Sequence, residues 1–261
     1  MASGSGQRGF GVAAGLDPKV AAPLAERCAR LGYSSLWSND HPGALGLETL
    51  AVFAEAAPEL ELGVAVMALD RHEPAAIAAH IERLGLDRER LWLGVGAGFD
   101  ERPLSRMTEA VDELRESLRG VRLVLAAMGP KMSRLAGSAY DGAFFNWMTP
   151  SFAAAARAKV AAGAGPGGQP PVFSYVRTAV GEDAAARLAK EEGFYRDLHD
   201  GYRKHFERLD EPEGTVGVAA ADRDSAQSAL VAYEALDVTV VRGLASANVE
   251  AMSAVAEAAA P

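Results

Sequence analysis

Short apolar runs alternate with amphipathic segments along the chain, and this alternation constrains the fold more than any other feature. The 261 residues hold eight such runs, about 33 residues for each. The runs are 10–13, 35–37, 60–68, 91–95, 123–127, 143–145, 172–179 and 238–241. The segments between them have helical spacing and are 19–31, 47–56, 74–84, 106–118, 132–138, 152–161, 183–235 and 247–258.

Strand–helix alternation with short connections predicts a parallel sheet that is buried on both faces. Eight such units predict an α/β fold, a single (β/α)8 TIM barrel. A doubly wound open sheet is the alternative. Because 49% of the residues are hydrophobic, the chain can fill one large core, but it is too short for two. We therefore expect one domain over 9–261 after a flexible tail at 1–8, which lacks the pattern of a signal peptide.

Two segments do not fit the regular repeat. Residues 162–171 read A-G-A-G-P-G-G-Q-P-P, a composition that favours turns. Residues 191–214 are aromatic and charged, and the spacing of Phe194, Leu198, Tyr202 and His205 predicts a helix with an aromatic face. On a barrel this face serves as core packing, as a lid or as a subunit contact.

Charge and cysteine content narrow the class of protein. A net charge of -9 argues against nucleic-acid binding, which needs a cationic surface. The single cysteine, Cys28, excludes an internal disulfide and a cysteine-based metal site. His41, His72 and His80 lie in different segments, so no metal site is expected. No apolar run reaches the roughly 20 residues that span a bilayer, and we expect a soluble cytoplasmic protein with no membrane partner.

The segment W-S-N-D-H-P-G at 37–43 follows the second predicted strand. In barrel enzymes the active site lies on the loops after the strands' carboxyl ends, which places Asp40 and His41 there. A histidine titrates near neutral pH, and an adjacent carboxylate can orient it or raise its pKa. The pair is therefore a candidate catalytic pair. The alternative is a solvated turn with a local hydrogen bond from Asp40.

Three further loops carry candidate binding residues. After the fourth strand, Gly94, Gly96 and Gly98 allow close backbone approach, but Phe99 stands where a dinucleotide fingerprint needs glycine. After the fifth strand, A-A-M-G-P-K at 126–131 opens a helix whose start suits a phosphate, with Lys131 adding charge. After the last strand, Arg242 lies where barrels often bind phosphate. The alternatives are a simple turn and a surface arginine.

In this order, the motifs resemble those of the bacterial luciferase-like superfamily of flavin- and deazaflavin-dependent oxidoreductases. The similar stretches are R-L-G-Y-S-S-L-W-S-N-D-H at 30–41, E-L-G-V-A-V-M-A-L-D-R-H-E-P at 61–74, L-W-L-G-V-G-A-G at 91–98 and A-A-M-G-P-K-M-S-R-L-A-G-S-A-Y-D-G at 126–142. The resemblance covers residues 10 to about 180, weakens over 181–230 and returns near 236–244.

The resemblance implies a barrel, here in a compact form, with a tricyclic redox ring across its open end. His41 would then donate or accept a proton beside the ring, with Asp40 next to it. It further implies a cis peptide bond between Ala65 and Val66 against the ring. The other implied cofactor contacts are Gly96, Gly98, Ala127, Met128, Gly129, Lys131 and Arg242. Trp147 and Phe173 would reach the pocket and contact the substrate.

The acid–histidine pair followed by Pro42 is more similar to the coenzyme F-420 branch than to the oxygen-using FMN branch. We therefore expect hydride transfer between F-420 and a small organic substrate, with an FMN-dependent monooxygenase as the alternative. A degenerate barrel that binds a ligand or partner is a third possibility. It predicts a mouth filled by Met67, Met128, Phe145 and Trp147. Few cations could bind a polyanionic tail, namely Arg71, Arg102, Lys131, Arg134, Arg177 and Arg242. The family habit implies a homodimer.

Overall fold

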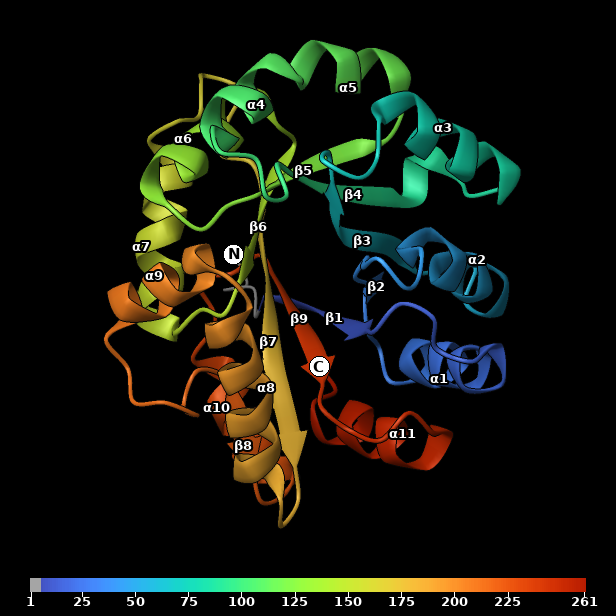
Figure 1. Cartoon of the computed structure of the whole chain (residues 1–261). Coiled ribbons are helices and arrows are strands. Elements are labelled where there is room, and N and C mark those ends of the chain that lie inside the picture. The colour runs from blue at the N-terminus through green and yellow to red at the C-terminus, as the bar shows by residue number, and fades with distance from the viewer. Residues whose placement is uncertain (1–5) are drawn as a thin grey trace.

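The computed structural model describes residues 6–261, which form a closed barrel of parallel strands surrounded by helices (Figure 1). The barrel strands are β1 (Gln7–Val12), β2 (Ser35–Ser38), β3 (Glu61–Ala68), β4 (Leu91–Gly96), β5 (Arg122–Ala126), β6 (Gly142–Asn146), β7 (Val172–Val180) and β9 (Val238–Gly243). Strands β1 to β7 pair in sequence, β7 pairs with β9, and β9 pairs with β1. All eight predicted runs are strands of this barrel, so the fold prediction is confirmed and the open sheet is wrong.

A ninth strand, β8 (Val218–Ala220), was not predicted. It pairs with residues 178–180 at the end of β7, beyond the point where β6 stops pairing. Three residues are too few to show a two-residue alternation in the sequence.

Helices cover the outside of the barrel (Figure 1). They are α1 (Pro18–Arg30), α2 (Gly46–Ala56), α3 (Pro74–Arg83), α4 (Pro103–Glu109), α5 (Val111–Ser117), α6 (Pro130–Ala139), α7 (Pro150–Ala161), α8 (Ala184–Leu198), α9 (Asp200–Leu209), α10 (Arg223–Val231) and α11 (Val249–Ala258), with a single 3-10 turn at Arg88–Arg90. Helices α1, α3, α4, α6 and α7 begin with proline, whose fixed φ suits the first helical position. Within the described residues, no helix is long and apolar enough to cross a membrane.

The aromatic segment at 191–214 is a helical hairpin and not the single helix that its spacing predicted. The chain breaks at His199, which has an extended backbone (φ -169°) and accepts the Gly201 N–H on Nδ1 at 2.9 Å. After the break, His205 and Phe206 are buried, whereas Phe194 and Leu198 before it are exposed. The second half of the segment is therefore core packing, as one of the three interpretations predicted.

The core has two layers separated by the barrel wall. The outer layer lies between strands and helices and is mostly aliphatic. The inner layer fills the barrel with Trp37, Val124, Phe144, Tyr175 and Val240, among others. Its rings pack closely, with centroids 4.9 Å apart for Trp37 and Phe144 and 4.7 Å apart for Phe144 and Tyr175. The barrel is therefore solid at mid-height, and this layer supports whatever lies above it.

The amino-terminal tail predicted over 1–8 lies outside the described residues as far as residue 5. Gln7 and Arg8 already belong to β1, where they pair with Val238 and Thr239 of β9. These pairs hold the start of the chain against the last strand.

Candidate active site

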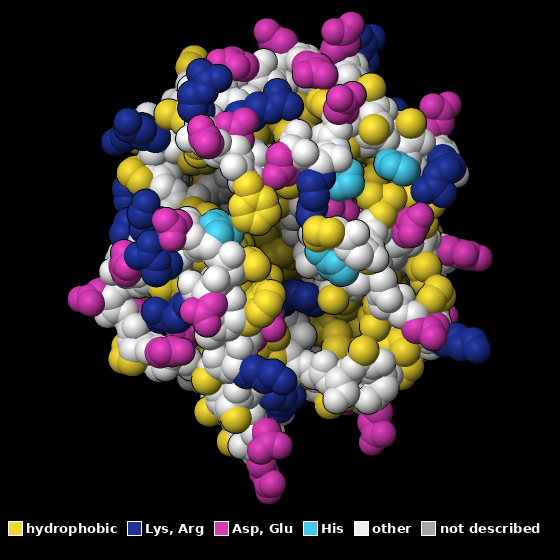
Figure 2. Space-filling model, in the orientation of Figure 1, with side chains coloured by type: hydrophobic (Ala, Val, Ile, Leu, Met, Phe, Trp, Pro, Cys, Tyr) yellow, Lys and Arg dark blue, Asp and Glu magenta, His cyan; other side chains and the backbone are white. Residues whose placement is uncertain are grey.

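The carboxyl ends of the strands meet at the mouth of the barrel. Its floor has one half of small residues and one half of polar and charged residues. Side chains alternate along a strand, so the residues two positions beyond the inner layer point into the mouth. They include Asn39, Ala126, Asn146, Arg177 and Arg242. Figure 2 shows a hollow at the centre of one face, surrounded by hydrophobic side chains with a Lys or Arg side chain at its edge.

One half of the floor is built from small residues of β3, β4 and β5. A Cβ on Gly96 would lie 2.8 Å from Val66 Cγ1 and 3.3 Å from Ala126 Cβ, so this spot accepts only glycine without a shift. The peptide bond between Ala65 and Val66 is cis, as the resemblance implied, and the pairing of β3 with β4 shifts register there. This part of the floor is therefore formed by backbone and small side chains.

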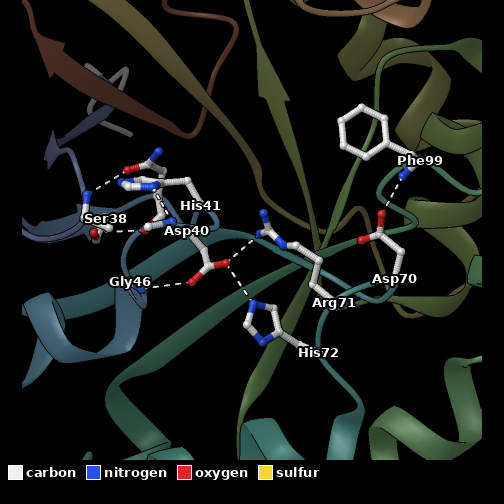
Figure 3. A network of polar contacts seen from close by, with 11 residues as sticks. Ser38, Asp40, His41, Gly46, Asp70, Arg71, His72 and Phe99 are labelled. Carbon is white, nitrogen blue, oxygen red and sulfur yellow. Dashed lines mark hydrogen bonds and ion pairs between the residues drawn. The ribbon is translucent and has the colours of Figure 1, made fainter.

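Asp40 is the centre of a polar network at the edge of this floor (Figure 3). Its Oδ2 accepts hydrogen bonds from Arg71 Nη2 at 2.6 Å and from His72 Nε2 at 2.8 Å, and its Oδ1 accepts the Gly46 N–H at 3.0 Å. The side chain is 1% exposed. Because these three donors occupy the carboxylate, the structure gives it no hydrogen bond to His41. The acid–histidine pair of the folded protein is Asp40 with His72, not with its neighbour in sequence.

His41 lies in an exposed turn on the rim. The turn is closed by backbone hydrogen bonds between His41 and Ala44, and the Gly43 N–H donates to His41 Nδ1 at 3.1 Å. Since Nδ1 accepts, the neutral ring carries its proton on Nε2. Among the described residues Nε2 has no hydrogen-bond partner, so it is free to exchange a proton with a bound molecule or with water.

The loop after β4 is tied to the loop after β3 through Asp70. Gly98 has φ +65°, and a Cβ there would lie 2.0 Å from Asp70 Oδ1. The Phe99 N–H donates to Asp70 Oδ2 at 2.9 Å (Figure 3). This turn leaves the Phe99 side chain 71% exposed, with its ring edge-on to His199 at 5.3 Å. The loop after β4 and the α8–α9 corner therefore meet at the rim.

The loop after β5 opens away from the barrel interior. Ala127 is buried, while Met128 and Gly129 line a cavity of about 320 Å³ together with Phe152, Lys159 and Arg208, among others. A Cβ on Gly129 would meet nothing within 4 Å, so its backbone is open to a ligand. Lys131 is exposed on α6 and is not part of this lining.

The two predicted substrate contacts lie elsewhere. Phe173 is the second residue of β7, so it lies at the amino end of the barrel, where it lines a cavity of about 570 Å³ beside Trp92. The prediction for Phe173 is wrong, because the mouth is formed by the other end of its strand. Trp147 is near the mouth but fully buried, packed under Tyr195 and Phe206 at centroid distances of 5.2 and 5.4 Å. A substrate could reach it only if the hairpin moved.

The side chains expected to plug a degenerate barrel mostly face outward. Met67 and Phe145 belong to the outer layer between strands and helices, and Met128 lines the cavity beside α6. Trp147 alone of the four packs on the mouth side, beneath the hairpin. The floor is therefore covered by the hairpin on one side and is not filled by these residues.

The first half of the chain is similar to a known protein family. Residues 2–125 match the family model described as luciferase-like monooxygenase. This match covers just under half of the chain, which is therefore similar to the luciferase-like family over that segment. The matched segment holds Asp40, the cis bond and the glycines of β4, which are the residues that build the small half of the floor and its polar edge.

One curated protein is similar in sequence, and several solved structures are similar in fold. The 5,10-methylenetetrahydromethanopterin reductase of Methanolobus tindarius is 28% identical over 203 residues, which cover 63% of this chain and 62% of that protein. The chain thus spans about three fifths of the length of this curated relative. An F-420-dependent secondary alcohol dehydrogenase in complex with an F-420–acetone adduct superposes with a TM-score of 0.71 at 17% identity, covering 98% of this chain and 99% of that chain. The coenzyme F-420-dependent tetrahydromethanopterin reductase from Methanopyrus kandleri has a TM-score of 0.69 at 17% identity, with 97% and 98% covered. These two structures share the fold.

Sequence reasoning did not place His72 or Asn146 in the site, and it named Arg177 only as one of six cations that could bind a polyanionic tail. His72 follows β3 in the D-R-H-E-P stretch, so its place after a strand was a signal for the rim. Arg177 interrupts the apolar run V-F-S-Y-V-R-T-A-V, and a charge inside a buried strand is the kind of exception that marks a site. The structure places it on the floor beside Arg242.

Proposed function

We propose that this protein transfers a hydride between coenzyme F-420 and a small organic substrate. The observation that carries the proposal is the flat patch at Val66, Gly96 and Ala126, which fits a planar ring because any side chain at 96 would occupy that space. When bound, the deazaflavin would supply hydride chemistry, and the protein would supply position and a proton. The F-420-dependent proteins among the fold relatives support this choice of cofactor.

On this proposal, His41 and Asp40 have different tasks. His41 Nε2 is free and lies on a rim loop, so it would exchange the proton that accompanies the hydride. Asp40 is a positioning residue, because its carboxylate is used to hold Arg71, His72 and the start of α2. Gly98 would let backbone approach the cofactor, and Ala127, Met128, Gly129 and Lys131 would follow its tail toward the cavity beside α6.

The test is a binding titration of the purified full chain with F-420 and, separately, with FMN. We expect F-420 fluorescence to change on saturable binding, and FMN to bind at least about tenfold more weakly. Gly96→Val places branched methyl groups against Val66 and should abolish F-420 binding while the protein stays folded. Gly165→Ala, at a position where a Cβ meets nothing within 4 Å, is the matched control. Failure to bind either cofactor, or equal binding by Gly96→Val, would refute the proposal.

An FMN-dependent monooxygenase is the second candidate, favoured by the description of the matching family model. The same flat patch would accept either ring. Tight binding of FMN together with oxygen consumption in the presence of reduced FMN would favour this candidate over hydride transfer.

A further inference from the structure

Two arginines stand side by side on the floor of the mouth, and among the described residues no acidic side chain lies within salt-bridge distance of either. Arg177 of β7 and Arg242 of β9 are paired in register, each two positions beyond an inner-layer residue, Tyr175 and Val240. Within the described part of the chain neither forms a salt bridge. Nine other arginines do. What distinguishes Arg177 and Arg242 is that they are adjacent and lie on the floor of the mouth.

Arg177 is held rigidly and left partly unsatisfied. Its side chain belongs to a residue that is 3% exposed, and its guanidinium lies 4.5 Å from the ring centroid of Trp147 and 4.9 Å from that of Tyr195. Nη1 donates to Asn146 Oδ1, a neutral acceptor. Nε is buried and has no partner, and Nη2 has none among the described residues. A buried guanidinium normally requires charge-paired acceptors, so donors are left here for a molecule that the protein binds.

Arg242 adds a second positive charge beside the first. It is half-buried, and its one contact is a long one of 3.5 Å from Nη1 to the Gly11 carbonyl oxygen. Burial lowers the pKa of Arg242, and the neighbouring Arg177 guanidinium lowers it further, while Tyr175, Tyr195 and Glu191 raise it in part. Two adjacent guanidinium groups repel each other, and an anion between them would reverse that repulsion.

The arginine pair lies across the barrel from the small-residue half of the floor. In the closed order β1, β2, β3, β4, β5, β6, β7, β9, strand β7 lies across the barrel from β3, and β9 lies across from β4. The arginines therefore face Val66 and Gly96 from the opposite wall. A molecule held by its anionic end at the arginines would extend its other end over the small-residue patch.

We propose that Arg177 and Arg242 form a carboxylate-binding subsite, so that the substrate is a small organic acid held with its reducible group toward Gly96. This inference rests on the proposed function for its orientation, although the subsite itself does not require the cofactor. A planar carboxylate matches the donor geometry of arginine. The tail of a cofactor would have to lead out to solvent, whereas Arg177 is enclosed by Trp147, Tyr175 and Tyr195. A small acid would reach Arg177 when the hairpin that carries Tyr195 moves, as a substrate would to reach Trp147. The pair thus gives Arg242 a substrate role in place of the phosphate contact that its position predicted.

The first test is calorimetric titration of the full chain, without cofactor and in low-chloride buffer. Benzoate and propionate are compared with benzamide and propionamide, which have similar shapes and no charge, and with inorganic phosphate. We expect the carboxylates to bind and the amides not to bind. Equal binding of acid and amide would overturn the inference. Tighter binding of phosphate than of either carboxylate would also overturn it and would return the pair to a phosphate-bearing ligand.

Variants locate the binding. Arg242→Gln should weaken carboxylate binding by about 10- to 100-fold, because a charged hydrogen-bonding partner is lost, and Arg242→Lys should recover part of the loss. Arg177→Gln should weaken carboxylate binding to the same extent if this variant folds. If the Arg177→Gln variant does not fold, the result for Arg242→Gln alone tests the subsite. The matched control is Arg223→Gln, which removes an exposed arginine at the start of α10 and should change nothing. Unchanged carboxylate affinity in Arg242→Gln would refute the subsite.

A parallel F-420 titration separates this inference from the proposed function. If Arg242→Gln loses carboxylate binding and keeps F-420 binding, both stand. If the unaltered chain binds carboxylates but not F-420, the proposed function fails and the subsite remains. If Arg242→Gln loses F-420 binding along with carboxylate binding, the pair belongs to the cofactor and the inference fails.

Discussion

Replacing Asp40 by asparagine separates a positioning role from a catalytic one. The amide keeps an oxygen for the Gly46 N–H, but it removes the charge and turns an NH2 group toward the two donors, Arg71 and His72. Hydrogen bonds to a charged group contribute about 1.5–3 kcal/mol each. The loss is reduced here because the Arg71 and His72 side chains are 28% and 20% exposed and can turn to water.

We therefore expect Asp40→Asn to lower the free energy of unfolding by about 2 kcal/mol. For a chain of this size that corresponds to a fall in Tm of roughly 4–8 °C. The first assay is thermal unfolding followed by circular dichroism at neutral pH, and the second is turnover of F-420 followed by its absorbance. The matched control is Glu48→Gln on α2, whose ion pair with Arg83 is more than half exposed on both sides and should change Tm by less than about 1 °C.

The two measurements together decide the role of Asp40. If Asp40 is a positioning residue, Asp40→Asn should lower Tm and also reduce turnover, because Arg71 and His72 lose the carboxylate that holds them. An unchanged Tm with turnover abolished would show that the carboxylate acts on the reactants, and the interpretation of the network in Figure 3 would be wrong. An unchanged Tm with full turnover would show that the network contributes nothing.

Two further predictions concern the core. Gly63→Ala would place a Cβ 2.2 Å from the fully buried Trp37 ring, so we expect a loss of about 3 kcal/mol or failure to fold, measured by urea unfolding against Gly165→Ala. Burial lowers the pKa of His205 below its ordinary value of 6.5. The unfolded chain therefore binds more protons than the folded one below that pH, and stability should fall as pH drops from about 6.5 through the lowered pKa. His205→Gln should show a smaller loss of Tm between about pH 7 and pH 5, and an equal loss would contradict the assignment.

The strand pattern could be predicted because each barrel strand is a buried apolar run between helices of clear period. The helical hairpin could not be predicted from the sequence. The chain breaks at His199, but the helical spacing continues across the break through Phe194, Leu198, Tyr202 and His205. Periodicity reports which face is apolar, but it does not report a single residue that leaves the helical conformation. The side chain of His199 stabilises that break by accepting the Gly201 N–H, a contact with no periodic signature.

In the candidate site, the sequence predicted which residues lie near the mouth but not which of them contact one another. That Asp40, His41 and Gly96 lie near the mouth followed from their places after strands. The partner of Asp40 did not follow, because His72 comes from the next loop and only the pairing of β2 with β3 brings the two together. Phe173 was misplaced because its position within the run was not counted from the start of the strand.

The barrel divides its proposed tasks between two halves of the chain. The small-residue patch and the Asp40 network come from β2 to β5, almost all within the segment that matches the family model. Arg177, Arg242, Asn146 and the covering hairpin come from the later strands and helices, outside that segment. If the first half binds the proposed cofactor, the second half is free to differ with the substrate. Changes at Arg177 or Arg242 should then alter which substrate is accepted and leave cofactor affinity intact, whereas changes at Gly96 should do the reverse.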